Sequence, residues 1–125
     1  MLFDTDVLIW VFRGDRQAAA CVDSCEDRFI SIVSLMELFQ GARDRQEVRM
    51  IKDFLRDFGF RTVPLSENIG HRAVIYVEQY ALRTGLRVAD ALVAATSVES
   101  DIPLLSGDSR HYRAIAGLGF VAFKP

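Results

Sequence analysis

Four acidic residues could together catalyse a reaction at a phosphate group: Asp4, Glu37, Asp90 and Asp108. Each lies near the junction of a predicted strand or turn with a helix. Carboxylates crowded at one place repel one another, which raises some of their pKa values, and a divalent cation removes that repulsion. Ligands that are all oxygen favour Mg²⁺ or Mn²⁺, and such an ion activates water and stabilises an in-line displacement. This hydrolytic chemistry needs no serine, cysteine or histidine nucleophile.

Each acid also has a purely structural explanation. Asp4 is typical of a turn or a helix cap. Glu37 stands three residues after Ser34, which is the spacing of a capping box, and Asp90 suits the first turn of a helix. Asp108 follows a glycine, as turn aspartates commonly do. Taken singly, these explanations are the commoner ones, whereas the four acids together are much less expected by chance.

The elements that must position these acids alternate between strands and helices. Apolar runs predict strands at residues 1–3, 29–33, 60–63, 104–105 and 120–123. Helices are expected at residues 5–12, 16–25, 34–42, 48–58, 67–84, 90–99 and 110–116. Continuously apolar strands that alternate with helices are typical of a parallel sheet covered on both faces.

In such a sheet, the residues that follow the strands meet at one edge, and ligands bind there. Asp4, Glu37 and Asp108 should therefore converge. Asp90 opens a helix that precedes a strand, so its place at this edge follows less directly.

Length and composition predict one globular domain over residues 1–125. Half of the residues are apolar, and the chain is long enough to bury a core. No apolar run approaches the roughly 18 residues that span a bilayer, and the N-terminus lacks a signal-peptide pattern. We therefore expect a cytoplasmic protein with no membrane partner. The two cysteines, Cys21 and Cys25, are too few for a disulfide scaffold or a zinc site. A net charge of −2 leaves any binding of nucleic acid to local arginines.

The chain resembles PIN-domain proteins, and among them the VapC-type toxins of bacterial toxin–antitoxin pairs. Four motifs carry the resemblance: FDTDVLI at Phe3–Ile9, SIVSLMEL at Ser31–Leu38, RVADALVAA at Arg87–Ala95 and LLSGDSRHY at Leu104–Tyr112. Their order and spacing match the family over essentially the whole chain. One departure is Ser106, which stands where threonine is more usual but keeps the hydroxyl group.

The resemblance implies a three-layer α/β fold with a parallel five-stranded sheet between helices, and a metal-dependent endoribonuclease activity. It assigns metal-binding and catalytic roles to four acids: Asp4, Glu37, Asp90 and Asp108. These would hold one or two Mg²⁺ (or Mn²⁺) ions, with Asp6 and Ser106 as supporting residues. It also implies an RNA substrate, a homodimer, and a small antitoxin protein whose tail lies in or near the active-site groove.

Four arginines flank the predicted rim and are candidates for contacts with the RNA backbone: Arg43, Arg45, Arg110 and Arg113. Ordinary solvated arginines explain them equally well. We interpret His111 as a packing or surface residue rather than a catalytic base, and Tyr76 and Tyr80 as core or dimer contacts.

Three alternative functions stay open. The segment Asp4–Asp6 fits the Asp-x-Asp opening of a haloacid-dehalogenase-like phosphatase, but no second aspartate follows Asp108 at the spacing that this class needs. A receiver domain fits the length, yet no lysine occurs between Lys52 and Lys124 and no aspartate ends the third strand. The third alternative is a PIN-like module that binds RNA or a partner without cutting, against which the presence of all four acids argues.

Overall fold

Five short strands form one parallel sheet in the computed structural model, which describes residues 1–125. The strands are β1 (Leu2–Phe3), β2 (Phe29–Ser31), β3 (Arg61–Val63), β4 (Leu104–Ser106) and β5 (Phe120–Ala122). Their order across the sheet is β3-β2-β1-β4-β5. The chain moves outward from β1 to β3 and then crosses to the other side of β1 for β4 and β5. The crevice between β1 and β4 is therefore the topological switch point, where open α/β sheets bind ligands.

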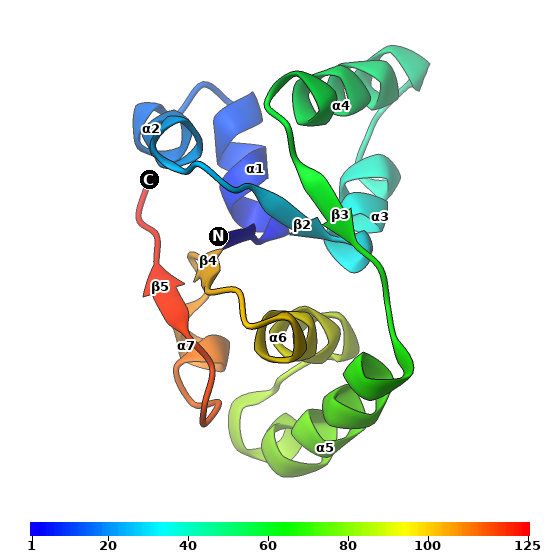
Figure 1. The fold of residues 1–125 in the computed structure, drawn as a ribbon, viewed down its shortest axis with the longest axis vertical. Coiled ribbons are helices and arrows are strands. Elements are labelled where there is room, and N and C mark those ends of the chain that lie inside the picture. Colours follow the sequence, from blue (N-terminus) through cyan, green and yellow to red (C-terminus); the bar gives the residue numbers. More distant parts are fainter.

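Seven helices flank the sheet (Figure 1). They are α1 (Thr5–Phe12), α2 (Arg16–Ser24), α3 (Ile32–Gln40), α4 (Arg45–Asp57), α5 (Glu67–Thr84), α6 (Val88–Ser100) and α7 (Ser109–Tyr112). Helices α5 and α6 pack together on one face, and α1, α2 and α4 cover the other. The predicted fold class, a parallel five-stranded sheet between helices, is confirmed.

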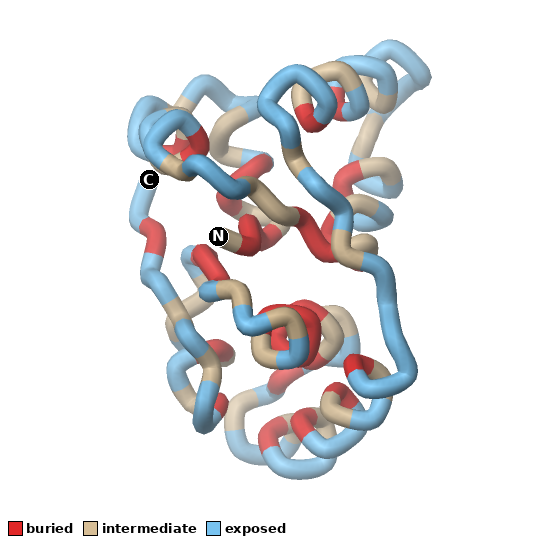
Figure 2. Tube along the Cα trace, viewed as in Figure 1, coloured by how far each residue is buried: buried red, intermediate tan, exposed pale blue.

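Successive side chains of a strand belong to two different cores. Leu2 and Leu104 face the core built with α5 and α6, whereas Phe3 and Leu105 face the core built with α1, α2 and α4. All four are buried, and Figure 2 shows buried residues in β1, β2 and β4 and along α6, whereas the edge strands β3 and β5 are mostly exposed. Side chains alternate between the faces of a sheet, so a strand covered on both sides must be apolar at every position.

Strand β2 ends two residues earlier than the sequence pattern predicts. The hydroxyl of Ser31 accepts a hydrogen bond from the backbone N–H of Val33 (3.1 Å), so α3 begins at once, at Ile32. Ile32 and Val33, two β-branched residues that favour a strand, therefore lie in the first turn of a helix. The predicted capping box is wrong, because Ser34 is buried inside α3 and Glu37 lies in its second turn.

Local signals placed the ends of the longest helix correctly. Ser66 caps α5, and Gly85 ends it with a left-handed backbone (φ 76°) that favours glycine. Helix α6 begins at Val88, two residues before the predicted start at Asp90. Helix α7 is a single turn, shorter than the predicted 110–116. No helix has both the length and the apolar character needed to cross a bilayer.

Candidate active site

Asp4 occupies the switch point itself. It follows β1 and caps α1, where its Oδ1 atom accepts a hydrogen bond from the backbone N–H of Thr5 (2.9 Å). Its Oδ2 atom accepts a hydrogen bond from the hydroxyl of Ser106, the last residue of β4 (2.7 Å). The same hydroxyl accepts from the backbone N–H of Asp108 (3.0 Å). The Asp4 carboxylate is thus held by the start of α1 on one side of the crevice and by the end of β4 on the other.

Asp6 holds the loop that follows β4. Its Oδ2 atom accepts a hydrogen bond from the backbone N–H of Gly107 (2.9 Å). A Cβ atom at position 107 would lie 2.7 Å from that same oxygen, so only glycine allows this approach. The other carboxylate oxygen of Asp6 is buried with no hydrogen-bond partner. These contacts anchor the loop, and a supporting role of Asp6 in a metal site stays a prediction.

Asp90, Asp108 and His111 gather beside Asp4. One potential ligand atom of each lies within 4.8 Å of those of the other two. His111 Nδ1 lies 2.6 Å from Asp108 Oδ2, and Asp108 also caps α7 by accepting from the backbone N–H of His111 (3.1 Å). Asp90 is the third residue of α6 and accepts from the backbone N–H of Arg87 (3.3 Å). We call Asp4, Asp90, Asp108 and His111 the acid cluster.

His111 was assigned to packing or to the surface from the sequence, but the structure places its ring against a site acid. The reason is local, because Asp108 caps the single turn of α7 and His111 follows three residues later. Residues three apart on a helix are neighbours. An aspartate at a helix start with a histidine three positions on is the local pattern that brings the two side chains together.

Burial makes Asp4 a weaker acid than an ordinary aspartate. It raises the pKa of this carboxyl from its ordinary value of 3.8 to about 7. The negative charges of Asp6 and Asp90 act in the same direction, whereas the hydrogen bonds from Ser106 and Thr5 lower the pKa. Burial and anionic neighbours destabilise the ionised carboxylate, and a bound cation would stabilise it. Carboxylates with one imidazole nitrogen are a donor set that fits a divalent ion such as Mn²⁺ or Mg²⁺.

Glu37 reaches the acid cluster through one intermediate side chain. Its Oε1 atom accepts a hydrogen bond from the hydroxyl of Thr5 (2.7 Å), and Thr5 directly follows Asp4. Glu37 is exposed to solvent, and it is not part of the compact group formed by Asp90, Asp108 and His111. The structure therefore brings three of the four predicted acids together and leaves the fourth at the rim.

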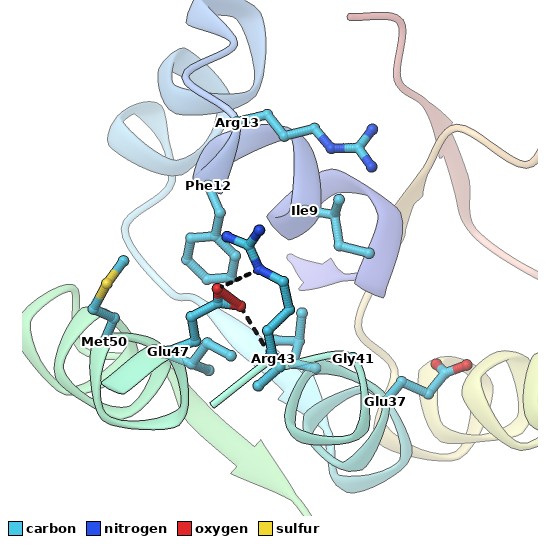
Figure 3. A pocket seen from close by; sticks show the side chains of 11 residues that line it. Ile9, Phe12, Arg13, Glu37, Gly41, Arg43, Glu47 and Met50 are labelled. Atoms are coloured by element: carbon cyan, nitrogen blue, oxygen red, sulfur yellow. Dashed lines mark hydrogen bonds and ion pairs between the residues drawn. The ribbon is translucent and has the colours of Figure 1, made fainter. Parts of the chain in front are cut away.

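A groove of about 620 Å³ lies between α1, α3 and α4, beside Glu37. We call it the apolar groove, because Ile9, Phe12 and Met50 line it and are exposed. Figure 3 shows Glu37 at one end and Met50 at the other. Arg43 also lines the groove, and its Nε atom donates a hydrogen bond to Glu47 (2.9 Å).

The other three predicted arginines stand elsewhere. Arg45 begins α4 and Arg110 lies in α7, and both are exposed. The guanidinium carbon of Arg113 lies 5.4 Å from the ring centroid of Phe120. Of the four predicted arginines, Arg43 is therefore the one that lines the apolar groove together with Glu37.

The chain belongs to the PIN domain family, because the family model matches residues 1–117. The resemblance inferred from the four motifs is confirmed. The family match decides against the phosphatase alternative. The sheet order decides against the receiver alternative, which would place β1 between β2 and β3 rather than between β2 and β4.

Solved structures of toxin–antitoxin complexes share the fold. A chain of a toxin-antitoxin complex from Klebsiella pneumoniae is 26% identical, with a TM-score of 0.82 over 97% of this chain and 95% of that one. FitAcB from Neisseria gonorrhoeae gives 22% identity and a TM-score of 0.76 over 95% and 94%. VapBC2 from Rickettsia felis, solved bound to a DNA fragment from its promoter, gives 14% and 0.80 over 98% of both chains. No curated protein matches this sequence.

Proposed function

We propose that this protein is a metal-dependent endoribonuclease that acts as the toxin of a toxin–antitoxin pair. The observation that carries the proposal is the grouping of Asp90 and Asp108 near Asp4, which the Ser106 hydroxyl links to the backbone of Asp108, at the switch point of a PIN-family sheet. When bound by these carboxylates, Mg²⁺ or Mn²⁺ would activate water and stabilise the charge that develops on a phosphodiester.

The remaining groups hold this site in place. Ser106 orients Asp4 through the 2.7 Å hydrogen bond, and Asp6 fixes the loop that carries Asp108. Glu37 closes the rim and acts on the cluster through Thr5. His111 adds the one nitrogen donor near the acids, and it favours Mn²⁺ over Mg²⁺ because imidazole suits the softer ion.

RNA would be bound through its phosphates. Arg43 is the best placed of the predicted arginines, because it lines the groove that Glu37 also lines. Arg45, Arg110 and Arg113 would add contacts from α4 and from the end of the chain. Guanidinium groups suit phosphate oxygens, and the net charge of −2 offers no general attraction for RNA.

The apolar groove supports the antitoxin part of the proposal. Its exposed apolar side chains fit one face of an amphipathic helix, and its end at Glu37 would bring the tail of such a partner to the acid cluster. Exposed Val74, Ile75 and Leu82 lie on one side of α5 and support the proposed homodimer.

The test is cleavage of RNA by the purified protein with Mg²⁺, with Mn²⁺ and with EDTA, beside the variant Asp4→Asn. The matched control is Asp15→Asn, because Asp15 also caps a helix by accepting from a backbone N–H, that of Ala18 (2.9 Å). Asparagine caps helices as well as aspartate does.

We expect cleavage that requires the metal, persists in Asp15→Asn and disappears in Asp4→Asn. A wild-type chain that cuts no RNA and binds neither ion in calorimetry would overturn the proposal. A binding module without catalysis would then be the better account.

A further inference from the structure

Tyr112 brings a buried hydroxyl group to the acid cluster. It is the last residue of α7, directly after His111, and only 1% of its surface is exposed. Its ring belongs to the core of α5 and α6 and lies 6.1 Å from the ring of Phe120, centroid to centroid. Its Oη atom makes no hydrogen bond of ordinary geometry, although the Asp4 carboxyl lies near enough to contribute to the raised pKa of this hydroxyl. Packing alone would be served as well by phenylalanine, which lacks this unsatisfied group.

The hydroxyl lies among carboxylates. Burial raises the pKa of Tyr112 above the usual range, and the negative charges of Asp4, Asp90 and Asp108 raise it further. A tyrosine hydroxyl is protonated at neutral pH, so Tyr112 faces these carboxylates as a hydrogen-bond donor. A buried polar group without a partner lowers the stability of the folded state. The nearby carboxylates are the acceptors that would remove this cost.

Asp4 has room for another donor. Its two carboxylate oxygens each accept one hydrogen bond, from Thr5 and from Ser106. A carboxylate has about four lone-pair positions, so places remain for a cation and for one further donor. Groups that donate hydrogen bonds to a metal-binding carboxylate fix its orientation and raise the affinity of the site for the metal.

We propose that Tyr112 is a positioning residue of the metal site, whose hydroxyl donates a hydrogen bond to the Asp4 carboxylate when a divalent cation is held there. This inference rests on the proposed function, because it takes the acid cluster to be a metal site. Tyr112 touches neither RNA nor the reacting atoms in this account. It acts through Asp4, whose other donors come from α1 and β4, so that α7 completes the support.

Two variants that each remove one hydroxyl test the inference. Tyr112→Phe keeps the ring and removes the donor. Tyr76→Phe makes the same change at a second buried tyrosine, whose hydroxyl lies near Arg72 rather than near the site acids. Tyr76 lies on α5, which carries none of the site acids, so this control reports the general effect of losing a core hydroxyl.

The first measurement is calorimetric titration of the full chain with Mg²⁺ and with Mn²⁺. We expect Tyr112→Phe to raise the Kd for both ions about tenfold, the lower end of the loss for an outer partner of a metal ligand. Tyr76→Phe should keep the wild-type Kd. The thermal midpoint of each variant without metal shows whether folding itself has changed.

The second measurement is the tyrosine ultraviolet difference spectrum on addition of Mg²⁺. The wild type and Tyr76→Phe should show a band from the perturbed Tyr112 hydroxyl, and Tyr112→Phe should lack it. A purely structural role would leave the metal affinity and this spectrum unchanged.

Three outcomes would overturn the inference: a wild-type Kd in Tyr112→Phe, an unchanged difference band, or an equal loss of affinity in Tyr76→Phe. Failure of the proposed function is a separate result. A wild-type chain that binds metal but cuts no RNA refutes the ribonuclease while leaving Tyr112 to be judged by binding. A wild-type chain that binds no metal refutes both.

Discussion

The acid cluster and the apolar groove lie next to each other, yet they are built in opposite ways. The cluster is buried or half-buried, and strand ends and helix caps hold its carboxylates through hydrogen bonds of 2.6–3.3 Å. The groove is an open surface on which Ile9, Phe12 and Met50 are exposed. In the acid cluster, carboxylates repel one another and a cation would relieve the repulsion. In the apolar groove, apolar side chains are exposed and a partner would cover them. Neither arrangement helps the isolated chain to fold, which is typical of functional sites.

Glu37 connects the two regions. It lines the groove, and it also accepts the hydrogen bond from Thr5, the residue that follows Asp4. An occupant of the groove therefore sits one side chain away from the cluster. This adjacency gives a physical route by which a bound partner would block the nuclease.

The largest effect is expected for Asp4→Asn, and it has opposite signs for activity and for stability. RNA cleavage should fall by more than about 100-fold, beyond the loss that removing an outer partner causes. The free energy of unfolding without metal should rise at pH 8, by up to about 4 kcal/mol. Asparagine removes the buried charge, but it cannot accept from both Thr5 and Ser106, so the net gain will be smaller.

The pH dependence follows from the raised pKa of Asp4, about 7 against 3.8. Between these pH values the folded state binds more protons than the unfolded state, so the stability of the wild type falls as the pH rises from about 4 to 7. Urea unfolding at pH 4 and pH 8 measures this. Equal stability of wild type and variant at pH 8 would contradict the buried charge.

Gly107→Ala should come next, with a loss of about 1–3 kcal/mol of stability, because the new Cβ would lie 2.7 Å from Asp6 Oδ2 and disturb a buried carboxylate. The control is Gly70→Ala in α5, where a Cβ meets nothing within 4 Å. Alanine favours helix, so this control should gain about 0.5–1 kcal/mol. A loss at both positions in thermal unfolding would remove the special role of the loop after β4.

A smaller change, about tenfold, is expected in metal preference for His111→Asn. Removing the imidazole takes away the nitrogen donor 2.6 Å from Asp108 and leaves oxygen donors that suit Mg²⁺. The ratio of Mn²⁺ to Mg²⁺ affinity should therefore fall, as measured by calorimetry. An unchanged ratio would show that His111 only supports Asp108.

The smallest effects belong to the groove. Arg43→Ala should leave the stability essentially unchanged, because its ion pair with Glu47 is exposed. It should still weaken RNA binding a few-fold and reduce the salt dependence by about one unit of slope. The exposed Arg16 on α2 gives a control, Arg16→Ala, that should change neither. Identical binding curves for both variants would exclude Arg43 from the RNA path.

The fold class, the five strands and both ends of α1 and α5 could be predicted from the sequence, because these depend on short spacings and on caps a few residues away. Ser66 and Gly85 bound α5 as predicted, and the strands were recognised because both faces of the sheet are covered. The four acids were likewise selected by their element junctions. Their assignment as ligands stays a prediction, although three of them do converge in the structure.

The assembly of the site could not be predicted, because it depends on contacts between residues far apart in the sequence. The hydrogen bond between Ser106 and Asp4 joins residues 102 positions apart, and no local pattern encodes such a contact. The same is true of Glu37 at the rim and of the Tyr112 hydroxyl among the acids. Sequence spacing encodes contacts within one helix turn or one strand, whereas the order of strands in the sheet sets which distant side chains share a buried space.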